Sequence, residues 1–421
     1  MKKSRFTFRI IIPLSVAAIF ACQNINVDTS VVDPCTFTYS TDKYSLPFDL
    51  VIENDDMDVE IWYTVDGTTP TQYGSTSAEY TGPVHIAKTT TVKAKGYKPG
   101  LQASNVSSAV YTFVWTRGTD MPGADGYLGR STFGCTELGG KIYCIGGWEK
   151  YTGFDGAVKT VLVYDPVSDV WDTAPDISSP RQQVEAVTYA GKIYIIGGAD
   201  SSGALVGTVE EFDTDGGGGS GAWTLKASMP TARYGHKLAV LGDKIFAFGG
   251  YNGTQLDTVE AYDPVGNTWS TCTSMPVATM EFGIGVVSGK AYVFGGATPT
   301  GVTKEAYVFD STLSAGAGSW SKLTDMPETG LNQSAIVCAD IIYSIGRSYN
   351  GSASTMTNYM FNPAIATGSE SWAEKTSIPV ARDYFGISTY DAKVFVISGY
   401  SSDGSSMYYS RVDIYEPAVD Y

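Results

Sequence analysis

An arginine recurs along the chain at a fixed distance from a Met-Pro pair or its counterpart. It lies three residues after the second residue of that pair. The position is filled by Arg181, Arg233 and Arg382, by Arg130 if a short insertion is allowed, and by Thr279 and Gly330 in two further copies. A guanidinium is a planar fork of donors that binds carboxylate, sulfate or phosphate through two parallel hydrogen bonds. The recurrence therefore predicts a site for an anionic ligand.

Other polar and aromatic residues follow the same sequence elements. Glu281 and Asn332 lie beside the two positions that lack arginine, and His236 lies three residues after Arg233. Aromatic side chains come directly after a recurring Gly-Gly pair or its relative. Aromatic faces combined with planar polar groups suit sugars or acidic peptides. The candidate ligand-binding residues are Arg130, Arg181, Arg233, Arg382, Glu281, Asn332, His236, Trp148, Tyr251 and Tyr400.

Composition argues against several other kinds of chemistry. The chain has 421 residues and a net charge of −16, which argues against a general nucleic-acid binder. It has only two histidines, too few for an imidazole copper site. The segment 216–221 satisfies GxGxxG by letter, but Trp223 opens a strand where a phosphate site needs a helix. Asp213 starts a calcium-like loop that lacks its bidentate glutamate, which leaves at most a weak calcium site. We expect no metal and no cofactor.

Two of the six cysteines flank a tight turn. Cys135 and Cys144 lie on either side of Gly139-Gly140, which predicts a hairpin with a two-residue turn. The two thiols then face each other at a distance that a disulfide can bridge. A Cys135–Cys144 disulfide, which an exported protein permits, and two buried free thiols are the alternatives. The chain has no CxxC pair and no Cys/His spacing of a zinc site.

The elements that carry these residues are short strands, and they repeat. A strand ending in Ile-Gly-Gly or a relative recurs every 46 to 52 residues, and Tyr/Phe-Asp-Pro and Trp signals follow it. The second residue of the pair is Gly147, Gly198, Gly250, Gly296, Arg347 and Gly399. The pattern resembles kelch repeats, whose unit of ~50 residues is a four-stranded propeller blade. The resemblance implies an all-β, six-bladed kelch-type β-propeller over residues 115–421. Arg347 breaks the glycine rule, so we expect its loop to differ.

The register of the tryptophans predicts how the ring closes. Trp115, followed by Met121-Pro122, matches the fourth-strand element although it precedes the first copy. The sixth copy ends at Tyr415-Glu-Pro417 without a tryptophan. We therefore expect the Trp115 strand to complete the sixth blade, which removes two open sheet edges.

The kelch resemblance places the recurring arginines near one another. In propellers the loops that carry them gather around the central channel at one face. Four guanidiniums would then form a ligand-binding face, or, alternatively, each would bond the backbone of neighbouring blades. We expect a binding module for an anionic sugar or a protein segment. One alternative is a sugar-acid mutarotase or epimerase similar to the sialic acid mutarotases, with Glu281 as acid or base and Arg233 holding the carboxylate. A structural surface scaffold is the other.

The N-terminus resembles that of a bacterial lipoprotein. A basic start and an apolar stretch over 10–20 lead to Ala21-Cys22. The resemblance implies a signal peptide over 1–21, lipidation of Cys22 and a tether over 22–33. The protein would then be exported and lipid-anchored at the outer membrane or cell surface, with no other membrane contact. Ordinary signal cleavage near Ala21 is the alternative.

Residues 34–114 predict a small β domain. Alternating segments are separated by turn pairs such as Asp66-Gly67. The run Tyr63-Thr-Val-Asp-Gly-Thr-Thr-Pro70 resembles the β-sandwich appended to chitobiases and hexosaminidases. The resemblance implies an immunoglobulin-like sandwich that acts as a spacer or accessory module without catalytic residues.

Overall fold

The computed structural model describes residues 31–44, 46–123, 129–151, 153–331, 334–348, 354–365, 371–401 and 407–420. The chain divides into two compact units. One comprises residues up to Thr38 together with Val51–Pro83 and Val92–Ala109. The other comprises Tyr39–Leu50, Val84–Thr91 and Val110–Tyr421. The second unit thus takes in three segments of the block 34–114, the last of them continuous with the repeated region.

The N-terminal block is built from short strands. One sheet has the order β2 (Asp42–Tyr44), β9 (Ser107–Phe113), β8 (Thr90–Tyr97), β5 (Glu60–Thr64) and β6 (Ala78–Glu79). Two strand pairs accompany it, β3 (Phe48–Leu50) with β7 (Val84–Ile86), and β1 (Thr36–Phe37) with β4 (Ile52–Glu53). Along β8, buried and partly exposed residues alternate, so that Val92 and Ala94 face a core. This arrangement is compatible with the predicted sandwich.

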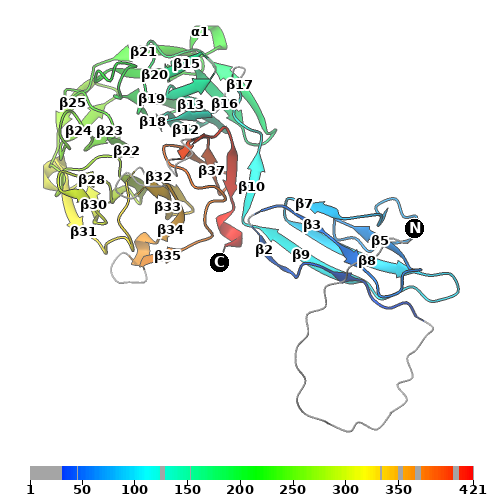
Figure 1. The fold of residues 1–421 in the computed structure, drawn as a ribbon. Coiled ribbons are helices and arrows are strands. Elements are labelled where there is room, and N and C mark those ends of the chain that lie inside the picture. Colours follow the sequence, from blue (N-terminus) through cyan, green and yellow to red (C-terminus); the bar gives the residue numbers. More distant parts are fainter. Residues whose placement is uncertain are drawn as a thin grey trace. The chain divides into compact units, whose positions relative to one another are not determined.

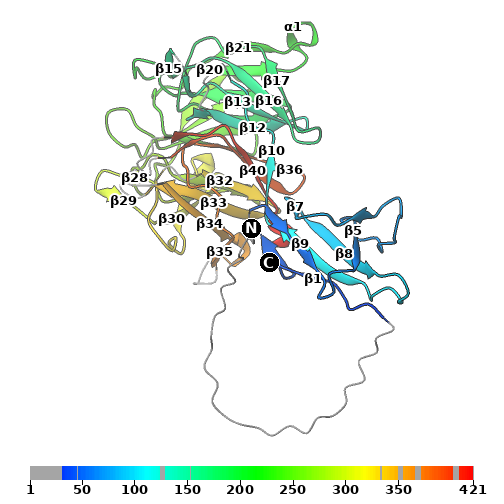
Figure 2. The same ribbon diagram turned by 45° about the vertical axis from the view of Figure 1, so that its right-hand side comes forward.

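The repeated region forms six four-stranded antiparallel sheets within the described residues, arranged as blades around a central axis (Figures 1 and 2). Blade 1 consists of β12 (Gly134–Leu138), β13 (Lys141–Ile145), β16 (Val161–Asp165) and β17 (Val170–Ala174), and blade 2 of β18 (Glu185–Tyr189), β19 (Lys192–Ile196), β20 (Val209–Asp213) and β21 (Ala222–Lys226). Blade 3 consists of β22 (Lys237–Leu241), β23 (Lys244–Phe248), β24 (Val259–Asp263) and β25 (Thr268–Thr271), and blade 4 of β26 (Gly283–Val287), β27 (Lys290–Phe294), β30 (Ala306–Asp310) and β31 (Ser319–Lys322). Blade 5 consists of β32 (Ser334–Cys338), β33 (Ile341–Ser348), β34 (Ser354–Phe361) and β35 (Trp372–Glu374), and blade 6 of β36 (Gly386–Tyr390), β37 (Lys393–Ile397), β40 (Val412–Tyr415) and β10 (Trp115–Gly118).

Shorter elements accompany the six blades. One small sheet has the order β11 (Gly129–Ser131), β14 (Trp148–Tyr151) and β15 (Phe154–Ala157). Two further pairs are β28 (Ala297–Thr298) with β29 (Gly301–Val302), and β38 (Tyr400–Ser401) with β39 (Met407–Tyr408). Among the described residues the helical pieces are single turns, namely α1 (Gly216–Gly219) and three 3-10 turns at Ser314–Gly316, Pro363–Ile365 and Pro417–Val419. The glycine-rich segment leads directly into strand β21, as expected.

The predicted ring closure is confirmed. Strand β10 pairs antiparallel with β40, with Trp115 opposite Tyr415 and Gly118 opposite Val412. The sixth blade thus takes three strands from the C-terminal end and its outermost strand from before blade 1. With the closing strand in place, the sixth sheet is complete and the ring of blades has no open end.

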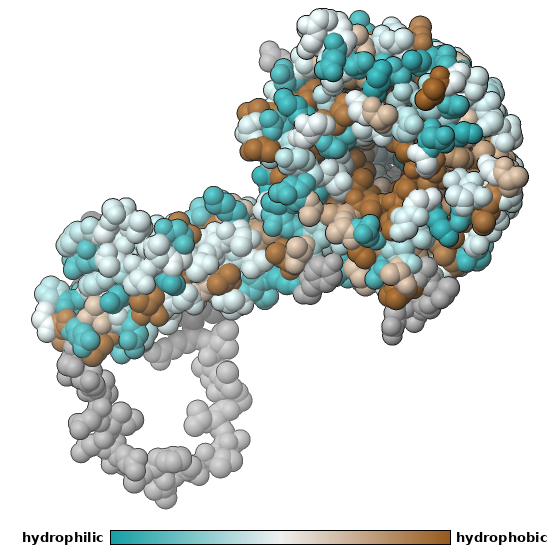
Figure 3. All heavy atoms as spheres, turned by 180° about the vertical axis from the view of Figure 1, so that it is seen from behind, coloured by the Kyte–Doolittle hydropathy of each residue, from teal (hydrophilic) through white to brown (hydrophobic). Residues whose placement is uncertain are grey.

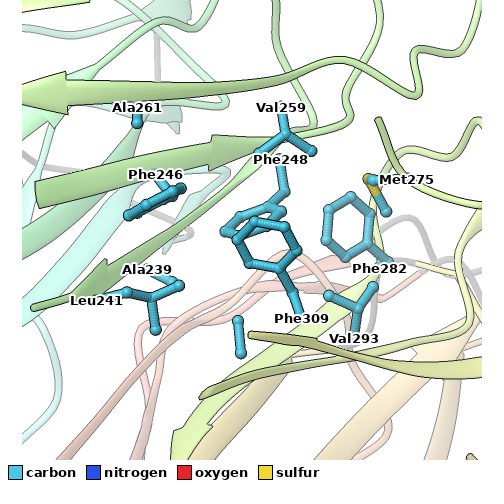
Figure 4. Close-up of a cluster of buried hydrophobic side chains, with 11 residues drawn as sticks. Ala239, Leu241, Phe246, Phe248, Val259, Ala261, Met275, Phe282, Val293 and Phe309 are labelled. Atoms are coloured by element: carbon cyan, nitrogen blue, oxygen red, sulfur yellow. The ribbon is translucent and has the colours of Figure 1, made fainter. Parts of the chain in front are cut away.

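The core lies between blades. One cluster joins Phe246 and Phe248 of blade 3 to Val293 and Phe309 of blade 4, as Figure 4 shows, with Phe282 from the loop that enters blade 4. A single blade has two apolar faces and can bury neither alone, so stacking against both neighbours provides the stability.

Tryptophans on the outermost strands join each blade to the one before it. Each indole N–H donates to a backbone carbonyl in the preceding blade's last loop, at 2.7 to 3.2 Å. The pairs are Trp115–Thr376, Trp171–Thr119, Trp223–Pro175, Trp269–Ala227, Trp320–Thr273 and Trp372–Thr324. The recurring Trp thus has a hydrogen-bond partner for its indole N–H while its ring packs against the neighbouring strands.

The Gly-Gly exits require glycine for steric reasons. Gly250 has φ of 102°, and a Cβ there would lie 2.8 Å from the carbonyl oxygen of Tyr234. In blade 5, where Arg347 replaces the glycine, β33 continues and pairs with β34 as far as Ser348, with a register shift between Ile345 and Arg347. The expectation of a different connection is confirmed, because the strand runs on where the other blades turn.

Candidate functional site

The four recurring arginines lie inside the protein. Arg181, Arg233 and Arg382 are 0% exposed and Arg130 is 1% exposed. Each forms an ion pair with a carboxylate of its own blade or of a hairpin inserted into it: Arg130–Glu149, Arg181–Glu210, Arg233–Glu260 and Arg382–Asp413. The Arg233–Glu260 and Arg382–Asp413 nitrogen–oxygen distances are 2.8 and 2.7 Å. Burial lowers the pKa of Arg233 to about 10, and the Glu260 charge opposes this shift.

This placement corrects the expectation of an arginine-lined ligand face. The guanidiniums are buried and paired with carboxylates, so they present no exposed fork to an anion. They fill the structural role that was the alternative, with carboxylates as their main partners in addition to backbone carbonyls. Arg233, the suggested carboxylate-binding group of a mutarotase, is therefore not available for that task.

The buried acids carry a signal that the repeat analysis missed. Glu210, Glu260 and Asp413 occupy the second position of the third strand in blades 2, 3 and 6. In blades 4 and 5 the arginine is absent. Tyr307 stands at that position in blade 4, and in blade 5 the equivalent by strand register is Tyr359, which lies opposite Ser344 as Glu210 lies opposite Ile195. The arginine and the acid thus occur together or are both missing in these five blades, which marks them as partners.

His236 is also a core residue. It is 0% exposed, and its ring packs against the turn at Gly197 and its Cβ against that at Gly250. Burial, with the nearby Arg233 charge, holds the pKa of His236 below its ordinary value. Its equivalents in other blades include Phe133, Phe282 and Phe385, so the neutral imidazole replaces a buried ring. The ligand-binding interpretation of His236 is therefore corrected.

A ring of residues surrounds one end of the central channel. Its described members are Thr132, Gln183, Gly235, Glu281 and Tyr384, each two residues after the recurring arginine or its replacement. All five have left-handed backbone conformations, with φ between 49° and 63°. Neighbouring members are linked by backbone hydrogen bonds, from Thr132 N–H to Tyr384, Gln183 N–H to Thr132 and Glu281 N–H to Gly235, at 2.7 to 2.9 Å. We call these five residues the channel-mouth ring. Asn332, the predicted site residue at the sixth position, lies outside the described residues.

Glu281 projects into a small cavity at this mouth. The cavity has a volume of about 70 Å³ and is lined by Thr132, Gln183, Glu185, Lys237, Glu281 and Tyr384, among others. Oε1 of Glu281 accepts hydrogen bonds from Gln183 Nε2 at 3.1 Å and from the Tyr384 hydroxyl at 3.4 Å. Lys237 pairs instead with Glu185, at 2.7 Å. Within the part of the chain that the structure describes, no Lys, Arg or His forms an ion pair with Glu281.

The channel continues inward from this cavity. A second space of about 350 Å³ is lined by the innermost strands β12, β18, β22, β26, β32 and β36. Glu185 and Lys237 border both spaces. Figure 3 shows the opening of the channel on one face, with hydrophobic side chains gathered around it.

Burial of Glu281 predicts a pH-dependent stability. Burial raises the pKa of Glu281 from about 4.5 to about 7, and Asp383 adds to this rise while Lys237 opposes it. The folded protein therefore binds a proton that the unfolded chain releases between these two values. The stabilisation is complete below about pH 4.5 and is lost as the pH rises through about 7. We expect the free energy of unfolding of the unmodified protein to fall, relative to Glu281→Gln, over this range. Denaturant titrations of both proteins at several pH values measure the difference, and parallel profiles would contradict it.

An aromatic groove adjoins the channel mouth. It has a volume of about 570 Å³ and is lined by Ser131, Thr132, Trp148, Lys150, Gln182, Tyr384, Tyr400 and Tyr408. The rings of Tyr400 and Tyr408 lie 5.1 Å apart, and the Trp148 indole donates to Asp155 at 2.6 Å. Lys150 also pairs with Asp155, at 2.8 Å. Thr132 and Tyr384 line both the groove and the Glu281 cavity, so the two spaces adjoin.

The structure thus brings together some of the predicted residues. Trp148 and Tyr400 lie in one groove beside Glu281. Tyr251 packs on Tyr234, with ring centroids 5.3 Å apart, and does not line the groove. Sequence reasoning missed Gln183, Tyr384 and Tyr408. The first two stand at the same repeat position as Glu281, and that alignment was the signal available.

The predicted cysteine hairpin is present, but the disulfide is not formed in the structure. Cys135 lies opposite Cys144 in the β12–β13 pair, as the Gly139-Gly140 turn predicted. Both are free thiols. They pack as small apolar side chains, with Cys144 in a buried cluster and Cys135 against it. Cys22, the predicted lipidation site, lies outside the described residues.

Comparisons with known proteins agree with this architecture. A family described as KLHDC2/KLHL20/DRC7 Kelch-repeats domain matches residues 132–281, and one described as Fn3 associated matches residues 50–111. Alpha-scruin of Limulus polyphemus is 33% identical over 133 residues, which are 30% of this chain and 14% of that protein. Kelch-like protein 35 of Mus musculus is 28% identical over 259 residues, 61% of this chain and 41% of that protein. The chain spans less than half the length of these two curated relatives.

A solved structure shares the propeller fold. The structure of YjhT matches with a TM-score of 0.57 and 15% sequence identity, over 70% of this chain and 95% of that one. The chain therefore contains a kelch-type β-propeller, and the Fn3-associated match is compatible with a β-sandwich before it. Among the described residues, no helix is long and apolar enough to cross a membrane. The same residues contain no group of three metal-ligating side chains placed to hold an ion.

Proposed function

We propose that this protein is a binding module whose propeller holds an extended segment of a protein partner in the aromatic groove beside the channel mouth. The observation that carries this proposal is the groove itself, in which Trp148, Tyr400 and Tyr408 adjoin a cavity with a carboxylate. Rigid aromatic side chains provide large contact areas at low entropic cost and are frequent anchors of protein interfaces. The kelch-repeat match supports the same conclusion, because kelch propellers generally bind protein partners.

Charge favours a protein segment over an anionic sugar. The four arginines that would hold an acidic group are buried and paired. The two cations that line the groove and the cavity, Lys150 and Lys237, are paired with Asp155 and Glu185. An acidic ligand would have to separate one of these pairs, whereas a neutral or basic segment would not.

We also propose that the protein acts outside the cytoplasm, anchored through a lipid on Cys22. The support is the sequence of the N-terminus, with its basic start, apolar stretch and Ala21-Cys22 end. An anchored propeller would present its groove to partners at the cell surface or in the envelope.

Alanine substitutions in the groove test the binding proposal. Peptides selected from a random display library against the full chain would be measured by calorimetry. We expect Trp148→Ala and Tyr400→Ala each to weaken binding at least tenfold, since truncation of an aromatic anchor costs about 2 kcal/mol or more. Tyr251→Ala is the matched control, because Tyr251 is a half-buried tyrosine outside the groove. Unchanged affinity in both groove variants, with melting temperatures preserved, would contradict the proposal.

A further inference from the structure

We propose that the channel mouth binds the cationic group of a lysine or arginine side chain carried by the bound segment, with Glu281 as its counter-charge. The inference rests on the proposed function and names the chemical class of its ligand. It reverses the polarity that the recurring arginines had suggested.

The hydrogen-bond pattern of Glu281 leaves one oxygen for a ligand. Both donors within the described residues, Gln183 Nε2 and the Tyr384 hydroxyl, bond to Oε1. These two bonds fix the orientation of the carboxyl group, and they leave Oε2 to accept from a guest. A charge-assisted hydrogen bond from an ammonium or guanidinium group is stronger than a neutral one, and it would compensate a carboxylate that has no ion-pair partner among the described residues.

The size of the cavity and its surroundings select a compact cation on an apolar stem. About 70 Å³ accommodates a terminal ammonium or guanidinium group and little more. The adjoining groove offers the rings of Tyr384, Tyr400 and Tyr408 to the methylene stem, and aromatic faces attract cations. The net charge of −16 would also draw basic segments toward the protein.

The existing charges of the cavity do not supply this cation. Lys237 is held by Glu185 at 2.7 Å, and both residues lie on innermost strands below the ring. Arg233 and Arg382 lie on the loops that carry the ring, but their guanidiniums pair with Glu260 and Asp413. None of these cations forms an ion pair with Glu281, which leaves its carboxylate to a cation on a bound molecule.

The test uses matched tripeptides on the full chain. Acetyl-Tyr-Lys-Tyr-amide and acetyl-Tyr-norleucine-Tyr-amide differ in the ammonium group, and their affinities would be compared by calorimetry. We expect the lysine peptide to bind about tenfold tighter, the gain typical of a hydrogen bond to a charged group. Glu281→Gln should abolish this difference while leaving the norleucine peptide unchanged. Glu79→Gln, which removes an exposed acid of the N-terminal block, should leave the difference intact.

The outcomes separate this inference from the proposed function. Equal binding of the two peptides to the unmodified protein would overturn the cation site, whether or not Glu281→Gln folds. If that binding were still weakened by Trp148→Ala, the peptide-binding function would stand without the cation site. If neither peptide bound the unmodified protein or any variant, and the display selection returned no binding peptide, both proposals would be overturned.

Discussion

Replacing Arg233 with methionine should lower the free energy of unfolding by about 3–5 kcal/mol. The substitution leaves Glu260, which is 4% exposed, without its guanidinium partner in the interior of blade 3. Thr231 still donates to Oε1 of Glu260 at 2.9 Å, but a hydroxyl does not compensate a buried charge. Guanidinium chloride titrations monitored by tryptophan fluorescence would measure the change through the midpoint at constant slope.

The double substitution Arg233→Met with Glu260→Leu is the informative control. Replacing both members of a buried ion pair by apolar residues of similar volume is often neutral or stabilising. We therefore expect the double variant to recover most of the lost stability. Blades 4 and 5 provide a precedent within the same chain, because they lack the arginine and have Tyr307 and Tyr359 where the acid would be.

The same experiment distinguishes structural arginines from ligand-binding ones. A surface-facing guanidinium that holds a ligand would contribute little to stability, and Arg233→Met would then leave the midpoint within about 0.5 kcal/mol of the parent. That result would contradict the buried ion pair. It would also restore the anionic ligand predicted from the sequence and oppose the cation site at Glu281.

The fold was predictable because the repeat is redundant. Six copies of the Gly-Gly exit or its relative, together with the outer-strand tryptophan, place four strands per unit, even though each signal is weak alone. The position of Trp115 before the first copy, with the missing tryptophan after Tyr415, was sufficient to predict the closing strand. Such signals concern backbone geometry and packing, which each blade must satisfy in the same way.

The direction of the arginine side chains was not predictable from their spacing. The repeat correctly places their loops around the channel, but a loop residue can point to the axis or into the blade. Here the arginine points into its own blade, and the residue two positions later lines the channel mouth in a left-handed conformation. Pairing Glu210, Glu260 and Asp413 with the arginines across the repeats would have revealed the inward direction.

The channel-mouth ring escaped sequence analysis for a different reason. Its described members are Thr, Gln, Gly, Glu and Tyr, so the position shares no residue type from blade to blade. Repeats reveal what must be constant, and a binding site differs at each blade because each blade contributes a different contact. Glu281 was singled out only because it lies beside a missing arginine.

Removal of the closing strand should have the largest effect on the propeller as a whole. A chain that begins at Gly123 lacks β10, so β40 becomes an open edge and Tyr415 loses the packing of Trp115 at 4.9 Å between ring centroids. Trp115 is 1% exposed and its indole donates to Thr376 at 3.0 Å, so this hydrogen bond between blades 5 and 6 is lost as well. Loss of a buried tryptophan alone costs about 3–5 kcal/mol.

We therefore expect the chain from Gly123 to be unfolded or aggregated, whereas a chain from Val114 should form a stable propeller. Size-exclusion chromatography and thermal melting of the two proteins would measure this. Trp115→Phe in the longer chain separates the contribution of the strand from that of the indole. It keeps the backbone pairing with β40 and loses the bond to Thr376 together with part of the buried ring. Equal stability of the two chains would mean that the ring holds without its closing strand. An open β40 edge exposes backbone hydrogen-bonding groups and part of the core between blades. Equal stability would therefore contradict the dependence of each blade on stacking against its neighbours.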